Sequence, residues 1–236
     1  MGLPFCRITA LTVSVISLAE MTDTVSAVIL QNGRPTGRVY RDSVEAYALR
    51  VLRGPKTSDR LRTVIVDMLN YGAAAQKKFG YAPTVPANSR LTPQEQKLAS
   101  VPVTPENVRE KGPKYYGTNL NLGSSMALTL FFKNITPDMH ATVTYTKHTG
   151  EKRELEISGD QFVKFNSSVY GIRVSTLVVA DAYQPVSVTV YDARGREVAS
   201  AVDSISGYVA RAESLGQLGT DILKFSEAAR LYFAER

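Results

Sequence analysis

The pattern of hydrophobic and polar positions changes twice along the chain. From Ser58 or Asp59, apolar residues recur at spacings of three and four, which predicts one long amphipathic helix that ends at Gly80. Residues 81–116 are instead rich in proline and polar residues. From Leu120 onward, apolar and polar residues alternate in short runs separated by turn residues, which is typical of antiparallel strands.

The alternating part predicts six strands and an inward-facing set of side chains. The strands are expected within residues 126–132, 141–148, 152–158, 162–165, 169–179 and 186–192. The inward-facing side chains are expected to include Leu128, Leu130, Val143, Tyr145, Val188 and Val190. Because helical patterns follow these strands, we expect an α+β fold in which an antiparallel β-sandwich is followed by a two-helix hairpin.

A short helix start is written twice in the sequence. DSVEAYALR, residues 42–50, returns as DSISGYVAR, residues 203–211, with Asp, Ser, Tyr and Arg in register. The match extends upstream to two strand-and-turn segments and downstream to two helical blocks, so the repeated unit reads as strand, hairpin, short helix and longer helix. The repeat predicts equivalent places for Asp42 and Asp203, for Tyr47 and Tyr208, and for Arg50 and Arg211. Both tyrosines are expected to be buried between helix and sheet.

The two copies differ in completeness, and this suggests a division of the chain. Residues 1–81 read as the C-terminal part of a first unit, and residues 82–116 as a proline-rich connector with a short helix capped by Thr92. Residues 117–236 read as a complete second unit, with a sandwich over 117–200 and a helical hairpin over 203–235. The chain therefore resembles the end of one unit followed by one whole unit.

The first 19 residues allow two interpretations. Arg7, the apolar run from Ile8 to Leu18 and the small residues Ser17 and Ala19 resemble a secretory signal with a cleavage site. Thr and Ser alternate with the aliphatic residues, however, which favours a strand. No segment approaches the roughly 18 to 20 consecutive apolar residues of a membrane span.

Charge adds one candidate binding surface. The formal net charge is +6, and arginines crowd residues 34–62. The candidate ligand-binding residues are Arg34, Arg38, Arg41, Arg53 and Arg60, which would attract an anionic ligand. The alternative is that carboxylates such as Asp42, Glu45 and Asp59 neutralise them within the chain. Aromatic residues do not interleave with these arginines, so a nucleic-acid partner is not expected.

Candidate catalytic and metal-binding groups are sparse. The histidines are His140 and His148, expected at exposed strand ends, and one cysteine, Cys6, accompanies them, so neither a Ser-His-Asp site nor a zinc site is indicated. The other candidates are the carboxylates Glu151, Glu154, Glu156 and Asp160, an acidic set for calcium (Asp23, Asp181 and Asp192), and an aromatic set for sugar (Tyr115, Tyr116, Tyr145 and Tyr191). Solvated faces, loops and core packing explain these sets as well, so we expect no catalytic residues, metal or cofactor.

The repeated motifs carry a resemblance. Residues 42–50, VDMLNYGAAAQKKFGY at 66–81 and ANSRLTPQEQ at 87–96 resemble a module of large secreted and cell-surface proteins of Gram-positive, clostridial gut bacteria. The resemblance implies an extracellular, multidomain setting. The module has no established catalytic or ligand residues that could be assigned to positions of this chain. The leading expectation is a non-enzymatic module for adhesion or spacing that binds a host or cell-wall ligand, which is a protein or an anionic glycan. A carbohydrate-binding module is the first alternative, and a glycan-active enzyme is the second.

Overall fold

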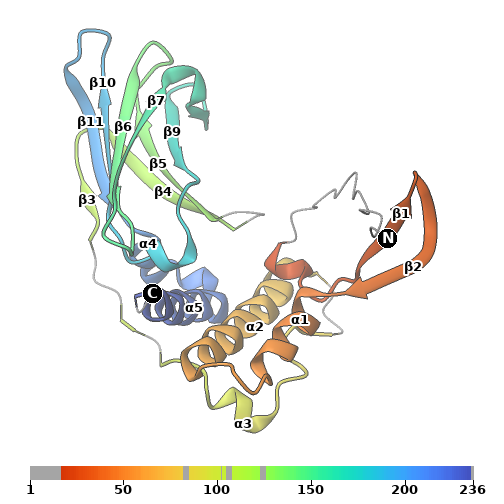
Figure 1. Cartoon of the computed structure of the whole chain (residues 1–236). Coiled ribbons are helices and arrows are strands. Elements are labelled where there is room, and N and C mark those ends of the chain that lie inside the picture. Colours follow the sequence, from red (N-terminus) through yellow and green to blue (C-terminus); the bar gives the residue numbers. More distant parts are fainter. Residues whose placement is uncertain (1–16, 82–84, 102, 105–107, 123–125, 235–236) are drawn as a thin grey trace.

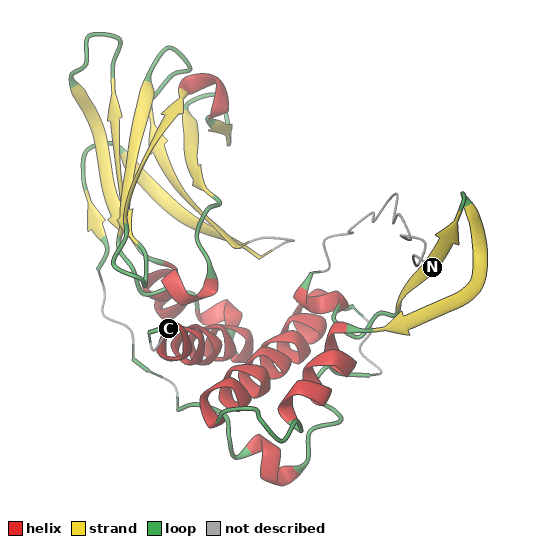
Figure 2. Ribbon diagram, viewed as in Figure 1, coloured by secondary structure: helices red, strands yellow, loops and turns green. Residues whose placement is uncertain are grey.

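The protein combines helices and antiparallel sheets in an α+β fold (Figures 1 and 2). The computed structural model describes residues 17–81, 85–101, 103–104, 108–122 and 126–234. A two-stranded hairpin projects from one end of a helical layer, and two larger sheets rise from its other end (Figure 1). Most of the segment for which a signal peptide or a strand was considered, residues 1–16, lies outside the described residues.

The first unit contains a hairpin and two helices. Its elements are η1 (Leu18–Glu20), β1 (Val25–Gln31), β2 (Arg34–Asp42), α1 (Val44–Leu52) and α2 (Asp59–Phe79). The side chain of Ser58 caps α2 by accepting a hydrogen bond from the backbone N–H of Leu61, and Gly80 ends it with a φ of 67°. The long helix expected from the apolar spacing is therefore confirmed.

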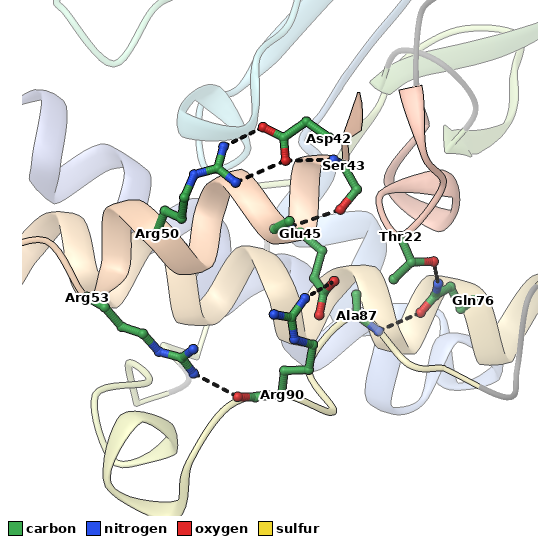
Figure 3. Close-up of polar contacts among 10 residues, drawn as sticks. Thr22, Asp42, Ser43, Glu45, Arg50, Arg53, Gln76, Ala87 and Arg90 are labelled. Atoms are coloured by element: carbon green, nitrogen blue, oxygen red, sulfur yellow. Dashed lines mark hydrogen bonds and ion pairs between the residues drawn. The ribbon is translucent and has the colours of Figure 1, made fainter. Parts of the chain in front are cut away.

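The connector lies along the helices of the first unit. Thr92 caps the short helix α3 (Pro93–Gln96), as its sequence predicts. The Gln76 side chain of α2 donates to the Thr22 hydroxyl at 3.0 Å and accepts from the backbone N–H of Ala87 at 2.8 Å (Figure 3). Further along, Ser100 donates to the Asp67 carboxylate and to the Lys224 carbonyl oxygen, so it joins α2 to the last helix.

The second unit holds two antiparallel sheets. They contain β3 (Glu110–Lys111), β4 (Tyr115–Leu122), β5 (Met126–Lys133), β6 (His140–Thr146), β7 (Lys152–Ser158), β8 (Val163–Lys164), β9 (Val169–Val174), β10 (Val186–Tyr191) and β11 (Glu197–Asp203). The strand orders are β3-β11-β10-β6-β7 and β4-β5-β9-β8. The six side chains expected to face inward are all buried, and residues of both sheets share one core. Strands β3 and β4 begin before residue 117, the predicted start of the second unit.

Short helical segments and one long helix complete the second unit. They are η2 (Gly159–Gln161), η3 (Val179–Asp181), α4 (Ile205–Arg211), η4 (Glu213–Leu215) and α5 (Gln217–Phe233). Helix α5 packs against α2, so the long helices of the two copies lie together (Figure 1). The rings of Tyr71 and Phe225, which the repeat places at equivalent positions, lie 6.0 Å apart.

The two units share their backbone geometry over the hairpin and the short helix. Val25 pairs with Asp42 at the start of the first hairpin, as Val186 pairs with Asp203 in the second, and the next three pairs keep the same register. Both η1 and η3 precede their hairpins at corresponding positions. The backbone N–H of Glu45 donates to the Met21 carbonyl at 2.9 Å, and the equivalent bond from Ser206 to Ala182 measures 2.8 Å.

Candidate functional site

The five candidate arginines lie on three different elements. Arg53, at the end of α1, donates to Glu95 at 2.8 Å. It also donates to the Arg90 carbonyl oxygen at 2.9 Å (Figure 3). Its guanidinium lowers the pKa of Glu95 to about 2. Arg60, at the start of α2, donates to the Leu231 carbonyl oxygen at 2.9 Å. These two arginines contact other segments of the chain, Arg53 through Glu95 and Arg60 through the Leu231 carbonyl oxygen.

The other three candidates remain exposed on β2. Arg34, Arg38 and Arg41 are solvent-exposed, and the described part of the chain provides no carboxylate partner for them. Their strand belongs to the hairpin of β1 and β2, which we call the open hairpin because no other described strand pairs with it. The candidate cationic surface is therefore reduced to this hairpin.

The repeated Asp and Arg residues form the same ion pair in both units. Arg50 donates through two nitrogens to the Asp42 carboxylate (Figure 3), and Arg211 donates to both carboxylate oxygens of Asp203 at 2.6 and 2.7 Å. The Arg50 hydrogen bond also lowers the pKa of Asp42. In each unit the backbone N–H of the next serine donates to the aspartate, and that serine, rather than the aspartate, caps the helix.

The prediction that both tyrosines are buried is wrong for Tyr47 and holds only in part for Tyr208. Tyr47 is 62% exposed, whereas Tyr208 is half-buried and packs against the core. Helix α4 contacts β4, and no described element covers α1 in the same way. The position of the tyrosine on its helix is repeated, but the sheet that covers it is found in the second unit only among the described residues.

The open hairpin also exposes apolar side chains. Its exposed large hydrophobic residues are Val25, Val28, Leu30, Val39 and Tyr40. Val186, the equivalent of Val25, is fully buried, and Ala201, the equivalent of Tyr40, is 3% exposed. Clusters of exposed apolar residues mark surfaces that bind other molecules. The hairpin is therefore the strongest candidate binding surface.

The histidines have structural contacts. His140 is exposed, as expected, and its ring stacks on Tyr191 at 5.4 Å between ring centroids. His148 is only 12% exposed, which contradicts the expectation of an exposed strand-end histidine. Its Nδ1 lies 2.7 Å from Asp181 Oδ1, and its backbone N–H donates to the same oxygen at 2.8 Å. This pair fastens the loop after β6 to η3. It could not be predicted because the two residues are far apart in sequence.

The acidic candidates lie apart from one another. Asp23 accepts a hydrogen bond from Tyr81, Asp181 holds His148, and Asp192 accepts from Arg196, which lowers the pKa of Asp192 to about 2. The described residues contain no group of three or more metal-ligating side chains. The four carboxylates near β7 are exposed, as expected: Glu151, Glu154, Glu156 and Asp160.

A groove of about 690 Å³ lies beside α2, α5 and the connector. Lys77, Lys224 and Asp221 line it together with amide side chains. Asp221 is the one carboxylate among the described lining residues, and burial raises its pKa. Because glycoside hydrolysis uses a pair of carboxylates, this groove lacks the groups for that chemistry among the described residues.

The aromatic candidates do not form one platform. Tyr145 is buried and shares a hydrogen bond with Thr176, and Tyr115 packs edge-on against Phe132. Tyr116 is exposed beside Phe165, with ring centroids 6.0 Å apart and planes tilted by 46°. Phe131 lies 5.3 Å from Phe165, and the Lys133 ammonium lies 5.4 Å from the Tyr116 ring. These residues form a small aromatic patch, defined as Tyr116, Phe131 and Phe165.

Comparisons with known proteins provide no family for this chain. No protein family, curated protein or solved structure matches it. None of the helices in the described part of the chain has the length and apolar character of a membrane span.

Proposed function

We propose that the protein is a non-enzymatic binding module of a larger multidomain protein that is secreted or held at the surface of a Gram-positive bacterium. In this proposal the second unit is a β-sandwich followed by a helical hairpin, and the first unit contributes the binding surface. The observation that carries the proposal is the open hairpin, which exposes apolar side chains and three arginines, whereas Val186 and Ala201, the equivalents of Val25 and Tyr40, are buried in the second unit.

The contacts of the buried titratable groups support a binding role over an enzymatic one. His148 is held by Asp181, and Asp67 is held by Ser100, so these groups serve the packing of loops and helices. The extracellular setting rests on the resemblance of the repeated motifs to a module of bacterial surface proteins.

A binding screen tests the proposal. The purified chain is immobilised and exposed to host secretory proteins, glycans and anionic cell-wall polymers. We expect a protein or an anionic polymer to bind, and binding of a polymer to weaken as salt rises, because the screening length falls to about 8 Å near physiological ionic strength. The double variant Arg38→Ala/Arg41→Ala should bind the polymer more weakly.

A matched control removes the same charge elsewhere. Arg173→Ala/Arg194→Ala takes two exposed arginines from the second unit and should bind like the wild type. Equal loss in both double variants would show that net charge, rather than the open hairpin, attracts the ligand. Absence of binding to every protein, glycan and polymer would contradict the proposed function.

The aromatic patch supports a second candidate function, carbohydrate binding. Exposed aromatic faces stack on sugars, and Tyr116 and Phe165 are 48% and 59% exposed. Because their planes are tilted rather than parallel, one short glycan segment fits this patch better than a long flat chain. In a glycan array, Tyr116→Ala/Phe165→Ala should lose the signal if the patch binds sugar, whereas Arg38→Ala/Arg41→Ala should keep it.

A further inference from the structure

Strand β1 has a free edge that its equivalent does not have. Within the described residues, β1 pairs with β2 only. Strand β10 pairs with β11 on one side and with β6 on the other, from Val186 opposite Tyr145 to Tyr191 opposite His140. Because the two hairpins share their register, the outer edge of β1 corresponds to the edge of β10 that β6 occupies.

The two edges of the open hairpin differ in chemistry. Strand β2 carries Arg34, Pro35, Arg38 and Arg41, and Gly37 has a φ of 81° beside a register shift. Charges, proline and bulges are the features that protect an edge strand from further pairing. The sequence of β1, VSAVILQ, contains none of these features. The edge of β1 is therefore the one suited to accept another strand.

A second contact point lies beside this edge. In the second unit, the loop after β6 places the N–H of His148 on the Asp181 carboxylate, which also accepts from the backbone N–H of Val178 at 3.2 Å. Glu20 occupies the position of Asp181 and accepts from the backbone N–H of Ser17 at 2.8 Å. Among the described residues, no histidine or other cation reaches Glu20. The Glu20 carboxylate therefore lies where the loop that follows an added strand would contact the first unit.

We propose that the edge of β1 binds an antiparallel strand of a partner protein, and that this strand has the chemistry of β6. Such a strand alternates apolar residues with threonines, as Ala141, Val143 and Tyr145 of β6 do, and continues into a cationic or N–H-donating loop directed to Glu20. Main-chain hydrogen bonds to the free edge supply affinity, and the side chains and the loop supply specificity. This inference rests on the proposed binding function and specifies the class of its protein partner.

A synthetic peptide tests the inference directly. The probe is a fluorescent peptide with the sequence of residues 139–148, MHATVTYTKH, titrated with the full chain while its anisotropy is measured. We expect saturable binding, and no binding of a peptide with the same residues in scrambled order. Glu20→Gln should weaken binding several-fold, whereas Glu213→Gln, which removes an exposed charge from the second unit, should not.

Methylation of the peptide backbone separates strand pairing from non-specific adhesion. Alternate N–H groups of a strand point to opposite edges. One peptide is methylated on the amides of its alanine, valine and tyrosine, and the other on the amides of its three central threonines. Strand addition requires that one methylated peptide loses binding and that the other keeps it.

Three results would overturn the inference. They are the absence of binding by the parent peptide, equal binding by the two methylated peptides, and a dimer of the full chain that the peptide does not dissociate. The last result would assign the β1 edge to a second copy of the chain. Because the glycan and polymer screen uses other ligands, the peptide can fail while the proposed function holds.

Discussion

The ion pairs Asp42–Arg50 and Asp203–Arg211 have the same partners and the same place between a hairpin and a helix, but they lie in different surroundings. The side chains of Asp42 and Arg50 are 45% and 60% exposed, whereas those of Asp203 and Arg211 are 0% and 24% exposed. The local sequence therefore determines the geometry of the pair, and the sheets of the second unit determine its burial. The same motif therefore forms a solvent-exposed ion pair in the first unit and a largely buried ion pair in the second.

Packing against the long helices differs between the units in a compensating way. A Cβ atom on Gly72 would lie 2.3 Å from the Met21 sulfur, so a large residue of the first unit packs against a glycine. The equivalent positions in the second unit hold the small Ala182 and the larger Ser226, both fully buried. The space between the 3₁₀ helix and the long helix is thus filled by a large residue opposite a glycine in the first unit, and by two small residues in the second.

The largest expected effect comes from breaking the buried pair. Arg211→Met should lower the free energy of unfolding by about 3 kcal/mol, because it leaves the fully buried Asp203 carboxylate without its guanidinium partner. Arg50→Met removes the same group from the exposed pair, where water solvates Asp42, and should leave stability close to the wild-type value. Urea denaturation of the two variants measures the difference.

Equal losses in the two variants would contradict the comparison between the units. They would mean that Asp42 is covered in solution by something that buries it as the sheets bury Asp203. A peptide that binds β1 should move the Arg50→Met result in that direction.

The sequence predicts local elements well because the residues that define them are adjacent. The serine cap, the apolar spacing and the terminal glycine of α2 all lie within that helix or beside it. Alternation likewise identifies the inward residues of β5, β6 and β10. Tyr47 was misassigned because its motif specifies a position on a helix, whereas its burial depends on a sheet that no adjacent residue encodes.

The candidate site could be predicted only in part for the same reason. The crowding of arginines in residues 34–62 is a property of the sequence, but a strand and two helices separate these residues in space. Arg53 finds Glu95 and Arg60 finds Leu231 through contacts between distant segments. The sequence of β1 is that of an uncharged alternating strand, but it does not show which strand pairs with the outer edge of β1.

The second-largest effect tests the exchange of volume at the long helices. Gly72→Ser gives the first unit the residue found at the equivalent position of the second. It should lower the free energy of unfolding by about 2 kcal/mol, because the added side chain overlaps Met21. Met21→Ala in the same chain supplies the small partner found at Ala182 and should recover part of that loss. A double-mutant cycle measures this coupling. Additive effects of the two substitutions would show that the side-chain sizes at positions 21 and 72 are not coupled.

Removal of the helix caps should have the same moderate effect in both units. The Ser43 hydroxyl accepts from the Ala46 N–H at 3.0 Å, and the Ser204 hydroxyl accepts from the Gly207 N–H at 2.9 Å. Ser43→Ala and Ser204→Ala should each cost about 1 kcal/mol. Thermal unfolding of both variants checks this expectation. A much larger loss for Ser204→Ala alone would show that burial, and not only the cap geometry, sets the contribution of this serine.

The smallest effect concerns pH and the equivalent carboxyls Asp67 and Asp221. Burial raises the pKa of both groups above the ordinary value, although hydrogen bonds from Ser100 and Gln217 and the nearby Lys224 oppose the shift. A raised pKa in the folded state means that the native protein binds the proton more tightly than the unfolded chain. The stability that each protonated carboxyl contributes is therefore lost as the pH rises from the unfolded value through the raised one. Asp67→Asn cannot ionise and keeps an oxygen that accepts from Ser100, so its stability relative to the wild type should increase as the pH rises from the ordinary carboxyl pKa through the raised one. Urea denaturation across this range measures the difference. If the free energies of unfolding of the two proteins change in parallel with pH, burial does not raise the pKa of Asp67.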